Sequence, residues 1–223
     1  MQVLIIPGVM KCGTSSLFRC LSGHPAVCPS RVKEPEFFSR LQDHGTDGSD
    51  YHALFDFDPS VHRVAMDGST GYSKPGEDAV PDRIRAAGVE PMIVFVLRDP
   101  FDRIVSHINH RRRHHDDDRM TDYIVEMSAY CRLIDRFARV FDRLHVTTLD
   151  ALINEPDEID AIQVFAGLDR MPLKFWHENR GDYDEDRRTL TAEERADIHA
   201  RLAPDMARLN ANYGVDVSRW GFD

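Results

Sequence analysis

Apolar residues follow two different periods along this chain, and their alternation predicts its architecture. Short, mostly apolar runs that are typical of buried strands occur at 3–6, 62–66, 92–97 and 144–149. Apolar residues recur every three or four positions, as in helices, at 14–22, 78–87, 101–112, 122–141, 157–168 and 191–212. Strands that alternate with helices favour a parallel sheet covered on both faces. We therefore expect a three-layer α/β fold with a central parallel sheet flanked by helices.

Two of the helical segments carry additional signals. In 122–141 the large side chains recur at spacings of three and four, which predicts a stripe that faces the core; they are Tyr123, Met127, Tyr130, Ile134, Phe137 and Phe141. The 191–212 segment opens with Thr191 and has Glu194 three residues later. This spacing is typical of a capping box, so we expect a helix to begin there.

The composition supports one folded domain and restricts its partners. With 223 residues, of which 42% are hydrophobic, the chain can bury a single sizeable core, so we expect one domain over 1–223. No apolar run approaches the ~20 residues of a membrane span, and the start does not resemble a signal peptide, so we expect a cytoplasmic protein.

The net charge of −10 gives no overall attraction to nucleic acid, and any bound phosphate needs a local basic site. The four cysteines lack C-x-x-C spacing and are expected to be free thiols.

The first predicted strand leads through a glycine-rich segment into the first helix. Residues 7–16 read Pro-Gly-Val-Met-Lys-Cys-Gly-Thr-Ser-Ser. Glycines let the backbone curl close to an anion, and the amides and dipole of a helix N-terminus attract negative charge. The segment predicts a phosphate-binding loop, whose contacts we assign to Lys11, Cys12, Gly13, Thr14, Ser15 and Ser16. The alternative is a plain strand-helix turn with a solvated lysine.

A second candidate site follows the predicted strand 92–97. Arg98 comes directly after the strand, Pro100 suits the first position of a helix, and Ser106 lies two turns into that helix. An arginine at the strand end and a serine on the helix can converge on one anion beyond the carboxyl edge of a parallel sheet. The alternative for Arg98 is a structural salt bridge.

Taken together, the two motifs resemble those of the sulfotransferases that use 3′-phosphoadenosine 5′-phosphosulfate (PAPS). The first loop is similar to the family's 5′-phosphosulfate loop, and the pair Arg98 and Ser106 to its 3′-phosphate-binding signature. Residues 33–38 and 67–72 resemble segments of the carbohydrate sulfotransferases, and 190–220 resembles the family's C-terminus. The resemblance covers essentially the whole chain. It implies a P-loop-like fold, PAPS as co-substrate, no metal, and a carbohydrate or small metabolite as acceptor.

The resemblance also implies roles at the reacting centre. Lys11 would stabilise charge that develops on the leaving group. Asp67 would be the base, in place of the glutamate of the heparan-type enzymes, and their following lysine is Gly68 here. A turn carboxylate is the alternative for Asp67, and Glu34, His107 and His24 are the reserve bases.

Two alternatives remain at the level of function. One is a P-loop kinase, although its loop would place the lysine directly after the second glycine, where this chain has Thr14. The other is an inactive module that retains a nucleotide cleft. The run of histidines and arginines at 107–115 is most simply a solvated helix end, with a donor or acceptor contact or a metal site as further alternatives.

Overall fold

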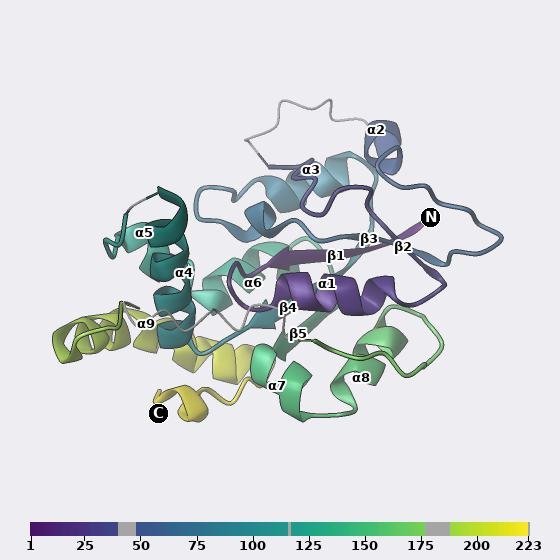
Figure 1. Ribbon diagram of the computed structural model, residues 1–223. Coiled ribbons are helices and arrows are strands. Elements are labelled where there is room, and N and C mark those ends of the chain that lie inside the picture. Colours follow the sequence, from purple (N-terminus) through teal and green to yellow (C-terminus); the bar gives the residue numbers. More distant parts are fainter. Residues whose placement is uncertain (40–47, 116, 177–187, 223) are drawn as a thin grey trace.

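The computed structural model describes residues 1–39, 48–115, 117–176 and 188–222, and its strands form a five-stranded parallel sheet (Figure 1). The strands are β1 (Gln2–Gly8), β2 (Val27–Pro29), β3 (Val64–Asp67), β4 (Pro91–Leu97) and β5 (Leu144–Thr148), in the spatial order β2-β3-β1-β4-β5. The four predicted strands are present. The edge strand β2 was not predicted, because three residues are too few to show a periodicity.

Helices cover both faces of this sheet. They are α1 (Thr14–Ser22), α2 (Gly48–His52), α3 (Val80–Ala86), α4 (Pro100–His115), α5 (Asp122–Glu126), α6 (Tyr130–Ala138), α7 (Leu149–Asn154), α8 (Glu158–Phe165) and α9 (Ala192–Tyr213), with the 3₁₀ turns η1 (Thr70–Ser73) and η2 (Val217–Trp220). In Figure 1 helix α1 lies in front of the sheet and α6 behind it, where Phe137 packs edge-on against Phe95 of β4. The predicted three-layer α/β fold is therefore confirmed. None of the described helices has the length and apolar character needed to cross a bilayer.

The predicted helix 122–141 is wrong in one respect, because it is two helices. The chain turns between α5 and α6, where the hydroxyl of Ser128 accepts a hydrogen bond of 2.6 Å from Nε of Arg103. The two helices are thus separated at a residue that contacts α4. The period of apolar residues within 122–141 contains no information about this contact. Five residues of the predicted stripe are buried, whereas Tyr123 is 41% exposed.

Helix α9 begins as the sequence predicts. The Thr191 hydroxyl accepts the amide of Glu194 at 3.1 Å, and the Glu194 carboxylate accepts the amide of Thr191 at 2.9 Å. Asp205 of the same helix accepts the amides of Cys131 and Arg132 at 2.9 and 3.0 Å, and so caps the start of α6. All four cysteines are free and buried.

The strand order creates a topological switch at β1. From β1 the chain moves to β2 and β3 on one side of the sheet, and it then crosses to β4 on the other side. The connections that leave the carboxyl ends of β1 and β4 therefore run in different directions. In parallel α/β sheets such a point leaves a crevice in which ligands bind.

Candidate active site at the carboxyl edge of the sheet

The loop between β1 and α1 has a backbone that depends on its two glycines. Gly13 precedes α1 with φ 92°, and a Cβ there would lie 2.7 Å from Cδ1 of Leu149. A Cβ on Gly8 would lie 2.1 Å from Oγ of Ser73. Lys11 itself adopts a left-handed φ of 72°, which is uncommon for a residue with a side chain. The loop is thus held in a narrow turn around Lys11.

The N-cap residue of helix α1 is Gly13, which has no side chain to cap the helix, and the first turn contains no acidic residue. The helix dipole therefore favours an anion there. The amide of Cys12, which the sequence assigns to a bound phosphate, instead donates to the carbonyl of Val9 within the loop at 3.1 Å. Burial raises the pKa of the Cys12 thiol to about 11. Thr14 and Ser16 are buried and Ser15 is half-buried.

The second motif lies on the strand next to this loop. The amide of Val9 donates to the carbonyl of Val96 at 2.9 Å, and Arg98 begins directly after β4. The Arg98 guanidinium lies 3.2 Å from the exposed carboxylate of Asp102. Asp99 accepts the amides of residues 101 and 102 at 2.8 and 3.1 Å, and so caps α4, which starts at Pro100 as predicted.

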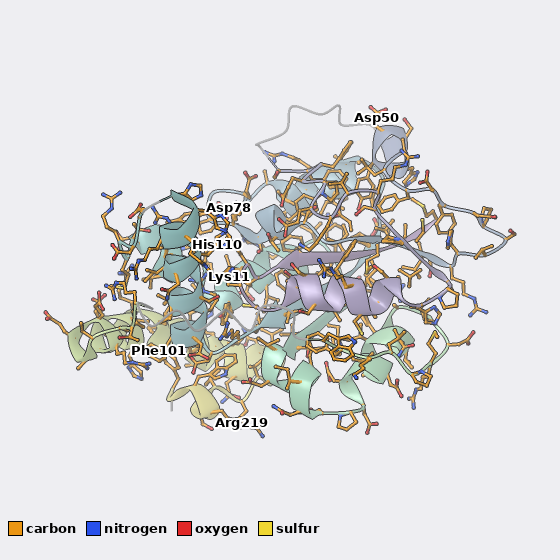
Figure 2. All side chains as sticks on the ribbon, viewed as in Figure 1. Lys11, Asp50, Asp78, Phe101, His110 and Arg219 are labelled. Atoms are coloured by element: carbon orange, nitrogen blue, oxygen red, sulfur yellow. The ribbon has the colours of Figure 1, made fainter. Side chains whose placement is uncertain are left out.

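One face of α4 carries polar residues toward the loop. Arg103, Ser106, His110 and Arg113 follow one another at spacings of three and four, so they share a face of the helix. Burial lowers the pKa of Lys11, and the charges of Arg113, Arg98 and Arg103 lower it further. Figure 2 shows the side chains of Lys11 and His110 in the same region, and Lys11 in turn lowers the pKa of His110.

The basic side chains of this site have few counter-ions. Within the described residues, Lys11, Arg103 and Arg113 form no ion pair with a carboxylate, although the chain as a whole carries a net charge of −10. Glu34 is the acidic group that raises the pKa of Lys11. An uncompensated group of cations beside an uncapped helix start is suited to a multiply charged anion.

Two histidines of the run at 107–115 belong to this site, but they are poor bases. His107 is buried, its Nδ1 lies 3.3 Å from Nη1 of Arg103, and burial and that charge lower its pKa to about 3. Burial and Lys11 lower the pKa of His110 to about 4. The exposed His114 and His115 form the solvated helix end that the sequence indicates. No group of three or more candidate metal ligands occurs among the residues that the structure describes.

The reserve base His24 lies elsewhere. It follows the C-terminal end of α1, at the opposite end of that helix from the loop. One of its ring nitrogens, Nδ1, accepts the amide of Ala26 at 3.1 Å, and Nε2 lies 3.0 Å from the carbonyl oxygen of Asp169. The structure therefore does not bring His24 to the candidate site.

Asp67 ends β3 at the carboxyl edge, as predicted, but it has no exposed surface. The hydroxyls of Tyr51, Ser69 and Tyr72 donate to its carboxylate at 3.1, 2.6 and 3.0 Å. Burial raises the pKa of Asp67 to about 6, although these hydrogen bonds oppose the rise. In this arrangement an acceptor has no surface of Asp67 to contact.

The hydroxyls that bind Asp67 also hold the segment 33–38. Oγ of Ser69 accepts the amide of Glu36 at 3.0 Å, and the Tyr72 oxygen accepts the amide of Phe38 at 3.3 Å. The Glu36 carboxylate accepts the amide of Gly71 at 2.8 Å, and a Cβ on Gly71 would lie 1.8 Å from that carboxylate. The two segments that resemble carbohydrate sulfotransferases are therefore packed against each other.

Glu34 is the carboxylate of this segment whose charge acts on Lys11. Its side chain is partly exposed, and Nζ of Lys33 donates to it at 2.5 Å. Its φ of 60° and that of Glu36, 54°, are both left-handed. Such conformations cost free energy in non-glycine residues and are concentrated at functional sites.

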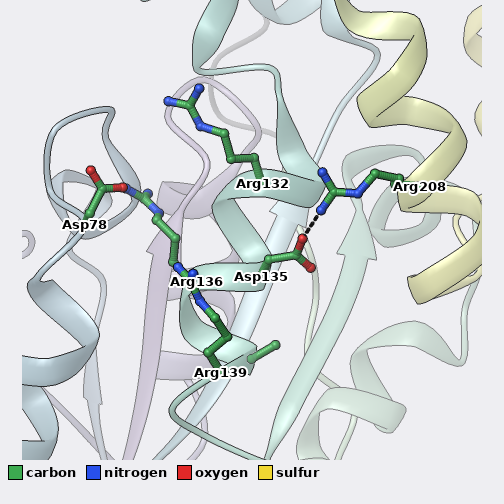
Figure 3. Close-up of a pocket in the computed structure, with 7 residues that line it drawn as sticks. Asp78, Arg132, Asp135, Arg136, Arg139 and Arg208 are labelled. Atoms are coloured by element: carbon green, nitrogen blue, oxygen red, sulfur yellow. Dashed lines mark hydrogen bonds and ion pairs between the residues drawn. The ribbon is translucent and has the colours of Figure 1, made fainter.

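A second basic region lies on the outer surface of α6. A cavity of about 590 Å³ is lined by Asp78, Arg132, Asp135, Arg136, Ala138, Arg139 and Arg208 (Figure 3). Three of its four arginines pair with carboxylates. Arg136 lies 3.0 Å from Asp78, Arg132 lies 3.6 Å from Glu126, and Arg208 pairs with Asp135. We therefore interpret this region as a salt-bridge network.

Solved sulfotransferases share this architecture. A sulfotransferase from Alicyclobacillus acidocaldarius matches with a TM-score of 0.80 and 23% identity, over 99% of each chain. The sulfotransferase domain of the Synechococcus PCC 7002 olefin synthase matches with a TM-score of 0.56 and 14% identity, over 96% of this chain and 94% of that one. The sulfotransferase domain from the curacin biosynthetic pathway matches with 0.52 and 15%, over 86% and 81%. No protein-family model matches the sequence. At these identities the likeness establishes the fold, which extends over nearly the whole chain.

Proposed function

We propose that this protein is a sulfotransferase that moves a sulfuryl group from PAPS to a hydroxyl or amine of a carbohydrate or small metabolite. The observation that carries the proposal is the group of cations around the uncapped start of α1 at the β1/β4 switch point. The amides of α1 and Lys11 would bind the 5′ end of the donor. Arg98 and Ser106 would bind its 3′-phosphate. The fold shared with solved sulfotransferases is consistent with this assignment.

In the proposed reaction an acceptor oxygen or nitrogen attacks the sulfur in line with the bond to the 5′-phosphate. The new bond to sulfur forms as that bond breaks, and adenosine 3′,5′-bisphosphate leaves with the bonding electrons. Lys11 stabilises the negative charge that grows on the bridging oxygen, and the acceptor proton passes to a carboxylate. No step requires a metal ion.

For that carboxylate we propose Glu34, with Asp67 as a positioning residue. Glu34 is partly exposed and lies within electrostatic reach of Lys11, whereas Asp67 is buried. Through Ser69 and Tyr72, Asp67 orients the backbone of the segment that carries Glu34. Glu34→Gln is expected to lower kcat by a factor of roughly 10²–10⁴ without changing the affinity for the donor. Asp67→Asn is expected to lower kcat by a smaller factor. A wild-type rate for Glu34→Gln together with an inactive Asp67→Asn would make Asp67 the base instead.

The proposed donor is tested by ligand-induced stabilisation and by turnover. Adenosine 3′,5′-bisphosphate is expected to raise the melting temperature strongly, whereas adenosine 5′-phosphate and ATP with Mg²⁺ raise it little. Radiolabelled sulfate should pass from PAPS to a hydroxylated acceptor in a mixed acceptor panel. Stabilisation by ATP with Mg²⁺ alone would favour the kinase alternative. Strong binding of the bisphosphate without transfer to any acceptor would favour an inactive nucleotide-binding module.

A further inference from the structure

Arg103 is a fully buried cation without a carboxylate partner among the described residues. Its guanidinium donates to Oγ of Ser128 at 2.6 Å and to the carbonyl of Ile124, and it lies 3.3 Å from Nδ1 of His107. Each partner is formally neutral, because His107 is not protonated near neutral pH. Burying an unpaired charge is costly, and proteins normally place a counter-ion beside it.

The position of Arg103 connects it to the proposed donor site. It lies one helical turn before Ser106 on the same face of α4, and its charge acts on both Lys11 and Cys12 of the loop. The hydroxyl of Tyr130 lies 3.9 Å from Sγ of Cys12 and donates to the carbonyl of Arg98 at 2.7 Å, so it joins the loop to the end of β4. Arg103 has no exposed surface, so a ligand bound at the loop does not contact it directly.

We propose that Arg103 is a positioning residue that provides the donor site with a permanent buried positive charge, which the bound nucleotide anion neutralises. The proposal rests on the proposed function for the identity of that anion. A charge of this kind is poorly screened by salt and attracts a multiply charged ligand without touching it. In the unliganded protein the same charge lowers stability, so ligand binding and folding stability are coupled through this residue.

The test compares a substitution that removes the charge with one that keeps it. Arg103→Met removes both the charge and the N–H donors of the guanidinium. Arg103→Lys keeps the charge but changes the arrangement of the donors. By calorimetric titration, Arg103→Met is expected to weaken binding of adenosine 3′,5′-bisphosphate by roughly tenfold or more, and Arg103→Lys by only about threefold. Equal losses in both variants, or no loss in Arg103→Met, would overturn the proposal.

Arg136 offers a matched control. It is also a buried arginine, but its charge is paired with Asp78. Arg136→Met is expected to keep wild-type affinity for the bisphosphate, and an equal loss there would assign the Arg103 effect to general damage. If circular dichroism shows that Arg103→Met is unfolded, Arg103→Gln, which keeps a donor for the carbonyl of Ile124, is used under the same criteria.

Binding of inorganic pyrophosphate tests the role of Arg103 without assuming that the donor is PAPS. If the wild type binds pyrophosphate but not the bisphosphate, the proposed function fails, and the Arg103 variants are judged on pyrophosphate. If the wild type binds neither anion, both proposals fail.

Discussion

Two groups of basic side chains in the described part of the chain differ in their counter-ions. The cavity on the outer surface of α6 has four arginines, three of which pair with nearby carboxylates. The group around the loop after β1 contains Lys11, Arg98, Arg103 and Arg113, and within the described residues Arg98 is the member that pairs with a carboxylate, the exposed Asp102. The number of arginines therefore does not distinguish the two groups. What distinguishes the loop is positive charge that the protein leaves uncompensated.

The largest expected effect is on turnover, from the removal of Lys11. Lys11→Ala is expected to lower kcat by about two orders of magnitude or more, because a charge stabiliser acts mainly in the transition state. Arg139→Ala, in the α6 cavity, is the control and should keep the wild-type rate. Steady-state kinetics with PAPS measures both. Similar losses in the two variants would erase the distinction between the two basic regions.

The second effect concerns selectivity for the 3′-phosphate. Arg98→Ala is expected to weaken binding of adenosine 3′,5′-bisphosphate by roughly tenfold or more, and Ser106→Ala by less, since a charged contact is stronger than a neutral one. Affinity for adenosine 5′-phosphosulfate, which lacks the 3′-phosphate, should change little. Fluorescence or calorimetric titration of both nucleotides decides the matter, and an equal loss for both would contradict the assignment.

The third effect is on stability, in the paired region. Arg136→Met should lower the free energy of unfolding by about 1–3 kcal/mol, because Arg136 is buried and donates to the carbonyls of Ser73 and Lys74 as well as to Asp78. Urea denaturation of the unliganded protein measures this loss. Arg103→Met, which removes an uncompensated charge, should lose less in the same experiment. A larger loss of unfolding free energy in Arg103→Met than in Arg136→Met would show that Arg103 contributes more to stability than Arg136.

A fourth, smaller effect depends on pH and on Asp67. With its pKa raised to about 6, the folded protein holds a proton that the unfolded chain releases near pH 4. Stability is therefore expected to fall by about 1–2 kcal/mol as the pH rises from 4.5 through 6. Asp67→Asn should remove this part of the pH dependence. Denaturant titrations of both proteins across this range test it, and parallel curves would count against the raised pKa.

No change at all is expected on removal of divalent metal. In the proposed mechanism Lys11 and the amides of α1 take the role that Mg²⁺ plays in a P-loop kinase. Turnover with PAPS should therefore be the same with and without a chelator. Loss of activity in the chelator and its recovery with Mg²⁺ would contradict the proposed mechanism.

Some features of the site could be predicted from the sequence because they are local. The glycine spacing around Lys11, the position of Arg98 after a buried strand and the start of α4 at Pro100 all follow from residues within one turn of each other. The basic face of α4 was also detectable, since Arg103 lies one turn from Ser106 and on its face. The prediction of a solvated helix end covered 107–115 and did not include Arg103.

The accessibility of each carboxylate could not be predicted in this way. Asp67 lies at the strand end where the sequence places it, but its burial depends on Tyr51 and Tyr72, which reach it from other parts of the chain. The exposure of Glu34 likewise depends on how its segment packs on η1. Position along the sequence therefore did not decide which of the two carboxylates is exposed.

The sequence by itself determined four of the five strands, their alternation with helices and the free state of the four cysteines. These follow from periodicity, backbone preference and residue type, which act over a few neighbours. Only the tertiary structure decided which charges keep a partner. Arg103 and Arg136 are both buried helical arginines. Packing places Asp78 beside Arg136, whereas the hydrogen-bond partners of Arg103 among the described residues are neutral. Electrostatic energy depends on distances across the fold, and the linear sequence does not contain those distances.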